Sequence, residues 1–301
     1  MAEWKLADEA KNRILERLDG KKVIFVGNSY TYFGRAVIPK KVEERSQEAR
    51  RGDRGYFYQL CRAAGAETEV TNWTYGNHGL KDLFDCCGAG RGCDGVLHHK
   101  DFKDRAFDYV ILQERTGKEI TPEAFLEHID RTTAFFREAN PKVEFYFLAQ
   151  RRLYEWQVDW LSQLKKLPER GITVVEWGAV AEELIRGEVA VPESNLRFNK
   201  NSFTVHQSAK DGFHPNLLAG YLTAGMAFSA LTGTPAVGQP YDFCTDPAVQ
   251  KSFDPKAYIK RYYGFEGSKT NLEEIFASPA AMRFLQERMD RVAKEERYRS
   301  Y

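Results

Sequence analysis

The sequence predicts an α/β protein with three layers, in which helices cover both faces of a central parallel sheet of about five strands. Five candidate strands recur along the first 180 residues, and each gap between them is long enough for a crossover helix. The first of them, 23–26, is an uninterrupted apolar run, as expected of a parallel strand that is buried on both faces. A helical C-terminal extension follows the sheet.

The expected elements follow in order along the chain, and together they describe a flavodoxin-like arrangement. Strands are expected at 23–26, 69–73, 109–113, 144–148 and 173–176. Helices are expected at 124–140, 154–170 and 179–186. A long apolar helix at 217–231 should begin near Pro215 and end at Gly233, because Pro favours the first turn of a helix and Gly the residue after its end.

The chain divides into one α/β domain and a shorter tail. Residues 1–233 are expected to form the domain, with a Cys- and Gly-rich insertion at about 85–100. Residues 234–301 lack strand alternation and begin with a connection rich in proline. Helices at 258–263, 272–276 and 280–293 are expected there, packed on the same domain.

Charge and hydropathy exclude several classes of protein. The 44 basic and 43 acidic residues nearly cancel, so no overall field favours nucleic acid or an anionic membrane. No apolar run approaches the roughly 20 residues of a membrane span. The first 20 residues are charged and amphipathic, unlike a signal peptide. We therefore expect a cytoplasmic protein, unless an export signal has been removed, and the oligomeric state stays open.

The insertion gathers three of the five cysteines. Cys86, Cys87 and Cys93 precede His98 and His99, and thiolates with imidazoles can bind zinc. Their spacing does not match the paired Cys-x-x-Cys of structural zinc sites, and a Cys86–Cys93 disulfide is not expected in a reducing compartment. The prevailing interpretation is a surface insertion with free thiols, without a metal or other cofactor.

Two polar turns hold the residues of a nucleophilic hydrolase. The first strand ends in Gly27-Asn28-Ser29-Tyr30-Thr31, which places Ser29 at a carboxyl strand end, where open α/β sheets bind ligands. Asp211 and His214 lie three residues apart in a later turn. A serine hydroxyl needs a base to take its proton and a group to orient that base. Ser29, His214 and Asp211 are therefore the candidate triad, with His206 a weaker alternative base because no acid lies at a matching spacing.

These two turns resemble conserved segments of a known family. Gly27-Asn28-Ser29-Tyr30-Thr31 resembles the Gly-Asp/Asn-Ser-x-Thr nucleophile segment of the SGNH hydrolases, the GDSL-type esterases. Asp211-x-x-His214 resembles the final segment of that family, and the order Ser, Asp, His is the same. The resemblance covers residues 22–230, outside the insertion and the C-terminal extension. It implies a serine esterase that forms an acyl-enzyme intermediate.

The resemblance also implies an oxyanion hole. Residues 74–80 resemble the second segment of the family, in which a glycine donates its backbone N–H; Gly76 is the first candidate and Gly79 the alternative. After the third strand the family has Gly-x-Asn-Asp, whereas this chain lacks the glycine and has Gln113 in place of the asparagine. Glutamine offers the same NH₂ donor on a longer side chain. We expect Gln113 to complete the hole with the N–H groups of Ser29 and Gly76.

Three further residues are expected near the substrate. Asn28 should position the nucleophile turn. Tyr30 should line a pocket or stack on a sugar ring, with burial in the core as the alternative. His78 lies near Gly76 in sequence and is either a substrate contact or an ordinary loop histidine. The expected substrate is a small-molecule or carbohydrate ester with a short acyl group, such as O-acetyl. The alternative function is a catalytically silent glycan- or ligand-binding domain on the same fold, which the replacement at Gln113 favours. A metal-dependent activity at the insertion is a third hypothesis, which metal analysis of the purified protein tests.

Overall fold

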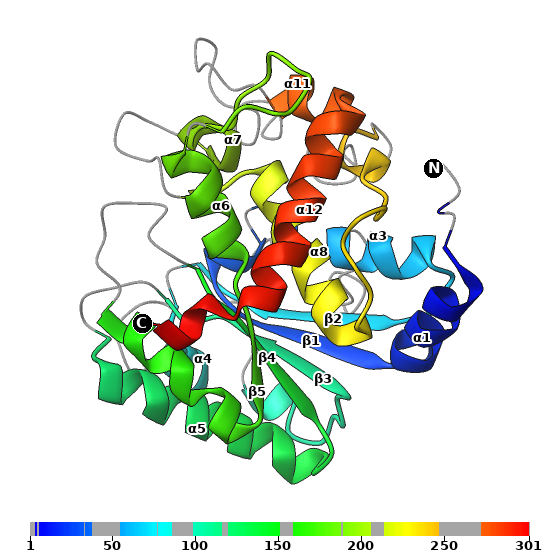
Figure 1. Cartoon of the computed structure of the whole chain (residues 1–301). Helices are drawn as coiled ribbons and strands as arrows, with labels where there is room; N and C mark the ends of the chain where they lie inside the picture. The colour runs from blue at the N-terminus through cyan, green and yellow to red at the C-terminus, as the bar shows by residue number, and fades with distance from the viewer. Residues whose placement is uncertain are drawn as a thin grey trace.

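A five-stranded parallel sheet runs through the middle of the protein (Figure 1). The computed structural model describes residues 4, 6–32, 34–37, 55–76, 78–85, 99–115, 120–150, 159–187, 189–205, 214–246 and 272–300. The strands are β1 (Lys22–Gly27), β2 (Glu69–Thr74), β3 (Tyr109–Leu112), β4 (Glu144–Leu148) and β5 (Ile172–Val175). They pair in the order β2-β1-β3-β4-β5, all parallel. The predicted α/β fold with a central parallel sheet is confirmed.

Successive residues of β1 enter two different hydrophobic cores. Val23 and Phe25 belong to the core on one face of the sheet, and Ile24 and Val26 to the core on the other. Side chains alternate across a strand, so an uninterrupted apolar run is buried on both faces. Helices must therefore cover both faces, as Figure 1 shows.

The first of these cores lies under several helices. They include α1 (Asp8–Leu18), α3 (Tyr56–Ala63), α6 (Trp177–Arg186), α8 (Leu217–Thr232) and α12 (Pro279–Glu295). α8 was predicted almost to the residue, but it starts after Pro215. Asn216 caps it instead, because its side-chain oxygen accepts the N–H groups of Leu218 and Ala219 at 3.0 and 3.1 Å. Pro215 lies in β7 (His214–Pro215), which pairs antiparallel with β6 (Thr204–Val205).

The second core lies under α4 (Leu80–Phe84), α5 (Pro122–Ala139) and the 3₁₀ segment η2 (Asp159–Lys166). The sequence predicts an α-helix over 154–170, and this prediction is wrong for its described part. Residues 159–166 form 3₁₀ turns, and a second 3₁₀ turn, η3 (Pro168–Arg170), follows. Pro168 lacks an N–H and cannot donate to the carbonyl four residues earlier, so the hydrogen-bond pattern of an α-helix is interrupted at this point.

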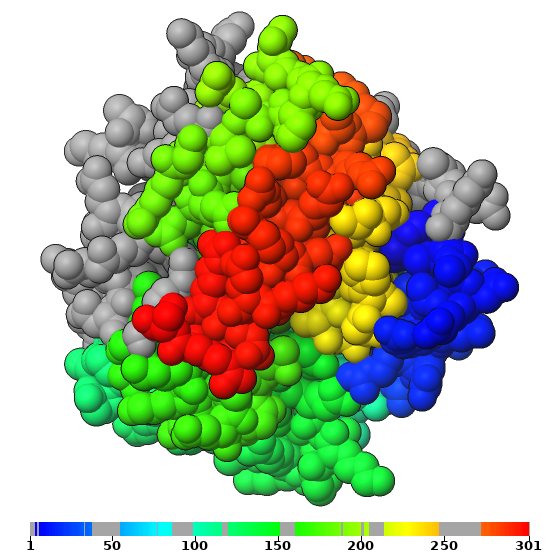
Figure 2. Space-filling view, viewed as in Figure 1, coloured from blue at the N-terminus to red at the C-terminus, as the bar shows by residue number. Residues whose placement is uncertain are grey.

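Within the C-terminal segment, α12 crosses the surface over α6 and α8 (Figure 2). The segment comprises η4 (Asp242–Cys244), α11 (Leu272–Ala277), α12 and η5 (Arg297–Ser300). Glu183 of α6 pairs with Arg288 at 3.0 Å, with Arg297 at 2.8 Å and with Arg291. α12 also shares the buried core of α6 and α8 through Met282, among others. The predicted helix at 258–263 lies outside the described residues.

Several short elements complete the described chain. The one-turn helices are α2 (Ser29–Tyr32) and α7 (Lys200–Phe203), and η1 spans His99–Asp101. None of the helices in the described ranges is long and apolar enough to cross a membrane. Within the same ranges, no group of three or more His, Cys, Asp or Glu side chains is placed to hold a metal ion. Cys86, Cys87 and Cys93 lie outside them.

Candidate active site

The nucleophile turn begins where β1 ends, at the carboxyl edge of the sheet. Gly27 is the last residue of β1, and α2 starts two residues later at Ser29. A side chain at Gly27 would crowd its neighbours, because its Cβ would lie 2.9 Å from Gln113 Oε1 and 2.9 Å from Thr31 Oγ1. Glycine therefore lets the strand pass close to Gln113 before it turns. Ser29 emerges from this turn with 9% of its surface exposed.

His214 reaches Ser29 from 185 positions away in the sequence. Its Nε2 atom lies 3.2 Å from Ser29 Oγ, within hydrogen-bond distance. Two local features place the imidazole: the β6–β7 pair, in which Val205 faces His214, and the cap of α8 at Asn216. The Asn216 amide also donates to Ser202 O at 2.9 Å, which ties the cap to the segment before β6.

Tyr30 packs directly on this histidine. The two rings stack with their centroids 5.6 Å apart and their planes 23° from parallel. Tyr30 is half-buried, so the contact restrains the orientation of the imidazole at the edge of the site. Asp211, the predicted third member of the triad, lies outside the described residues, as does His206.

Asn28 is buried and bonds within the protein. Its Nδ2 donates to His78 O at 2.9 Å, and its Oδ1 accepts the backbone N–H of Tyr30 at 3.1 Å. Only 1% of its surface is exposed. The side chain therefore joins the nucleophile turn to the segment after β2, which is the positioning contact expected of an Asn in a turn.

Gly76 lies beside the nucleophile helix, on the segment after β2. The N–H of the preceding Tyr75 donates to Gly27 O at 3.0 Å, so this segment continues the β1–β2 pairing beyond both strands. A Cβ at Gly76 would lie 3.0 Å from the hydroxyl of Tyr32, which is on the same one-turn helix as Ser29. The absence of a side chain thus allows α2 and the segment after β2 to approach closely.

His78 and Gly79 follow on the same segment. His78 Nδ1 lies 2.8 Å from Gly76 O, and its ring packs edge-on against Tyr75 with centroids 4.5 Å apart. The Gly79 N–H donates to Asp82 Oδ2 at 2.8 Å, as part of the cap of α4. Because that N–H is already bonded, the geometry favours Gly76 over Gly79 as a donor to substrate.

Gln113 lies underneath the nucleophile turn. Its Oε1 accepts the backbone N–H of Asn28 at 3.1 Å and the hydroxyl of Thr31 at 3.2 Å. Its amide nitrogen donates to the backbone oxygen of Glu114. The Asn28 N–H fixes which end of the amide faces the turn, because only the oxygen can accept it. The role of Gln113 as an oxyanion donor stays a prediction, since its NH₂ group faces Glu114 here.

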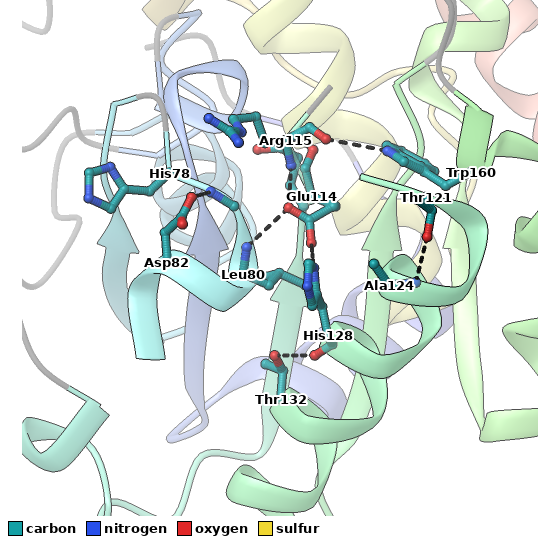
Figure 3. Close-up of polar contacts among 12 residues, drawn as sticks. His78, Leu80, Asp82, Glu114, Arg115, Thr121, Ala124, His128, Thr132 and Trp160 are labelled. Atoms are coloured by element: carbon teal, nitrogen blue, oxygen red, sulfur yellow. Dashed lines mark hydrogen bonds and ion pairs between the residues drawn. The ribbon is translucent and has the colours of Figure 1, made fainter. Parts of the chain in front are cut away.

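Sequence reasoning missed the contacts of Glu114. Its carboxylate accepts the Arg115 backbone N–H at 2.6 Å. It also accepts the Leu80 N–H at 3.0 Å and lies 3.0 Å from His128 Nδ1 on α5 (Figure 3). The available signal was an acidic residue at a buried strand end, followed by a histidine on the next helix.

Neither a family model nor a curated protein sequence matches this chain. Solved structures resemble it at low sequence identity. A DUF4886 family protein from Bacteroides uniformis has a TM-score of 0.52 at 13% identity, over 90% of this chain and 94% of that one. A putative GDSL-like lipase from Parabacteroides merdae has a TM-score of 0.45 at 16% identity, over 72% and 97% of the two chains.

A third structure, Axe2, an acetylxylan esterase from Geobacillus stearothermophilus, has a TM-score of 0.46 at 15% identity, over 72% of this chain and 96% of that one. The first of these likenesses shows a common fold over nearly the whole of both chains. All three identities are below 20%, so the function has to be argued from the residues of this chain.

Proposed function

We propose that this protein is a serine esterase of the SGNH type that hydrolyses a short-acyl ester through a Ser29–His214–Asp211 triad. The observation that carries the proposal is the 3.2 Å contact between Ser29 Oγ and His214 Nε2 at the carboxyl edge of the sheet. Nucleophile and base within hydrogen-bond reach are the minimum that a serine hydrolase requires. Asp211, three residues before His214, enters by the family resemblance as the acid that orients the imidazole.

The proposed reaction has two halves. In the first, Ser29 Oγ attacks the ester carbonyl carbon while His214 Nε2 takes the hydroxyl proton. The C–O bond to the alcohol then breaks, and His214 returns the proton to the leaving oxygen. In the second half, His214 takes a proton from water, the hydroxide attacks the acyl-Ser29 carbonyl, and the acid leaves as Ser29 recovers its proton.

The oxyanion of each tetrahedral intermediate needs hydrogen-bond donors. We assign this role to the backbone N–H groups of Ser29 and Gly76, which lie on adjoining turns after β1 and β2. Gln113 contributes mainly as a positioning residue in this proposal, because its oxygen holds the Asn28 N–H and the Thr31 hydroxyl. Fixed donors and a fixed nucleophile lower the barrier because no reorganisation is required as charge develops.

The substrate class is proposed from the side chains near the serine. Tyr30 and Tyr32 of α2 and Tyr75, which follows β2, are all half-buried. Aromatic side chains with polar edges suit the alternating apolar and hydroxylated faces of a sugar. We therefore propose an O-acetylated carbohydrate as the substrate, with no metal or cofactor in the reaction. A cytoplasmic location stays a prediction.

The experiment compares Ser29→Ala and His214→Ala with wild type on p-nitrophenyl acetate and a panel of O-acetylated sugars. Each variant should lose roughly 10⁴-fold or more in kcat while its thermal unfolding stays close to wild type. Ser194→Ala is the matched control, because Ser194 lies in a loop and bonds only locally, to the Leu196 N–H. Full activity in either site variant would reject the proposed nucleophile and base.

The second candidate function is a catalytically silent ligand-binding domain on the same fold. The observation that favours it is the contact of the Gln113 amide with Glu114 O, which leaves a site with one donor fewer than the family pattern. In that case wild-type protein would bind an acetylated sugar in calorimetry without hydrolysing it. Turnover that depends on Ser29 would exclude this alternative.

A further inference from the structure

A fully buried carboxylate lies next to the candidate active site and has no place in the triad. Glu114 is 0% exposed and follows Gln113 at the carboxyl end of β3. Figure 3 shows its side chain between α4 and α5, with contacts to three separate parts of the chain. Oε1 accepts the N–H groups of Leu80 and Arg115, and Oε2 lies 3.0 Å from His128 Nδ1.

A carboxylate in such a place is costly unless donors surround it. Burying an unpaired carboxylate costs several kcal/mol, and hydrogen bonds that satisfy its oxygens are what make the position tolerable. Gly79 leaves room for the carboxylate, because a Cβ at this position would lie only 2.6 Å from Glu114 Oε1. The lack of a side chain just before α4 therefore allows the carboxylate to reach the Leu80 N–H at the start of that helix.

The segment that Glu114 holds is the one that contains Gly76. Leu80 lies four residues after Gly76, and the Glu114 carboxylate fixes this outer end. The inner end is fixed by the nucleophile turn, through the Tyr75 N–H on Gly27 O at 3.0 Å and the Asn28 amide on His78 O at 2.9 Å. The described residues of this segment, Tyr75, Gly76 and 78–80, are thus tied to the nucleophile turn at the inner end and to Glu114 at the outer end.

We propose that Glu114 is a positioning residue of the esterase, and that His128 holds its carboxylate in place. The pair sets where the Gly76 N–H lies relative to Ser29 and so completes the oxyanion hole without touching substrate. The inference rests on the proposed function. A displacement of about 1 Å in such a site costs about 100-fold in rate, so loss of the carboxylate should act on turnover more than on binding.

The test measures kcat, KM and unfolding for Glu114→Ala, Glu114→Gln and His128→Ala. Glu114→Ala leaves the Leu80 and Arg115 N–H groups without the carboxylate, and kcat should fall about 10- to 100-fold with KM within about twofold. Glu114→Gln keeps one oxygen for those N–H groups, and its NH₂ can donate to His128, so it should restore most of the turnover. The kcat of His128→Ala should lie between those of Glu114→Ala and Glu114→Gln.

The matched control is Glu144→Ala. Glu144 begins β4, at the opposite end of the sheet, where its carboxylate bonds Arg17 at 2.6 Å and Tyr146 at 2.9 Å. The substitution should lower stability and leave kcat unchanged, because Glu144 lies away from the carboxyl edge of the sheet. Amide hydrogen exchange at residues 76–80 should speed up in Glu114→Ala and His128→Ala, and stay as in wild type in Glu144→Ala.

The outcomes separate this inference from the proposed function. If wild type is active but Glu114→Ala and His128→Ala change kcat no more than Glu144→Ala, the positioning role is overturned and the esterase stands. A rise in KM at constant kcat overturns it equally. If Glu114→Ala does not fold, Glu114→Gln and His128→Ala decide by the same comparison. If wild type shows no Ser29-dependent hydrolysis at all, the proposed function is rejected, and the positioning role of Glu114 is rejected as well.

Discussion

Gly220→Ala should damage the protein far more than an exchange of one hydrogen for a methyl group suggests. Gly220 lies in the first turns of α8, where that helix meets the chain just after the nucleophile helix. A Cβ at Gly220 would lie 1.5 Å from Gly34 O and 2.2 Å from Gly34 C. Because the obstacle is backbone, no side-chain rotation relieves it, and the two segments must separate by about 2 Å to reach ordinary contact distance.

The magnitude follows from two opposing terms. Alanine gains about 1 kcal/mol over glycine in a helix interior. Overpacking costs about 1–3 kcal/mol, and the upper end applies where backbone has to move. The net loss should be about 2 kcal/mol, which for a chain of this length lowers the Tm by about 3–4 °C. The loss of turnover should exceed the loss of stability. Gly34 follows Ser29 and Gly220 follows His214 in the chain, so a separation of about 2 Å between the two segments breaks the 3.2 Å contact between Ser29 Oγ and His214 Nε2.

Gly225→Ala in the same helix is the control. Its Cβ would lie 2.6 Å from Gln239 Oε1 and 2.7 Å from Met289 Cε, which are the ends of flexible side chains. We expect a change in unfolding free energy within about 1 kcal/mol of wild type and nearly full turnover of p-nitrophenyl acetate. Thermal unfolding and ester hydrolysis measure both variants. If Gly220→Ala were as stable and as active as Gly225→Ala, the close packing of α8 against the nucleophile segment would be wrong.

Three further predictions concern buried or paired groups. Cys61 and Cys244 should resist iodoacetamide at pH 8 in the folded protein, because burial raises the pKa of the Cys61 thiol to about 12 and that of Cys244 well above its ordinary value; peptide mapping that finds either alkylated at the rate of a free thiol would contradict this. Burial acts to raise the pKa of Glu183, but the hydrogen bond and charges of the arginines on and after α12 outweigh it and hold the pKa below 4.5. That carboxylate therefore stabilises the fold above about pH 4.5, and its contribution is lost as the pH falls further. Denaturant unfolding should show Glu183→Gln less stable than wild type by about 1 kcal/mol near pH 7, with the gap closing toward pH 3; a gap that does not vary with pH refutes this origin. Thr31→Val should lower kcat by less than about tenfold in the wild-type background. The effect should be smaller in the Gln113→Ala background, because the side chains of Thr31 and Gln113 share one hydrogen bond. Equal effects on kcat in both backgrounds would show that the two side chains act independently.

The strands and the meeting of Ser29 with His214 were within reach of sequence reasoning. The expected strand at 144–148 coincides with β4, and the other four agree within one residue at each end. The uninterrupted apolar run of β1 marks a parallel strand clearly, because both of its faces are buried. Parallel strands also present their carboxyl ends at one edge, so a serine after β1 could be placed there from its position alone.

The remaining contacts depend on tertiary structure that the sequence does not encode locally. Glu114 and His128 are 14 positions apart, on a strand end and a helix, and only the packing of α5 on the sheet brings them together. The direction of the Gln113 amide is likewise set by one backbone N–H, that of Asn28, which follows the neighbouring strand β1. A residue type at a family position predicts that a donor is present, whereas its neighbours decide where the donor points.

The most direct test of the account is covalent labelling of Ser29 with a fluorophosphonate, followed by peptide mapping of wild type, His214→Ala and Ser194→Ala. Wild type and Ser194→Ala should carry the label on Ser29 alone, and His214→Ala should react at least about 100-fold more slowly, because the imidazole no longer takes the hydroxyl proton. An unlabelled Ser29 in wild type, or equal labelling rates with and without the His214 imidazole, would contradict the claim that these two side chains form one catalytic unit.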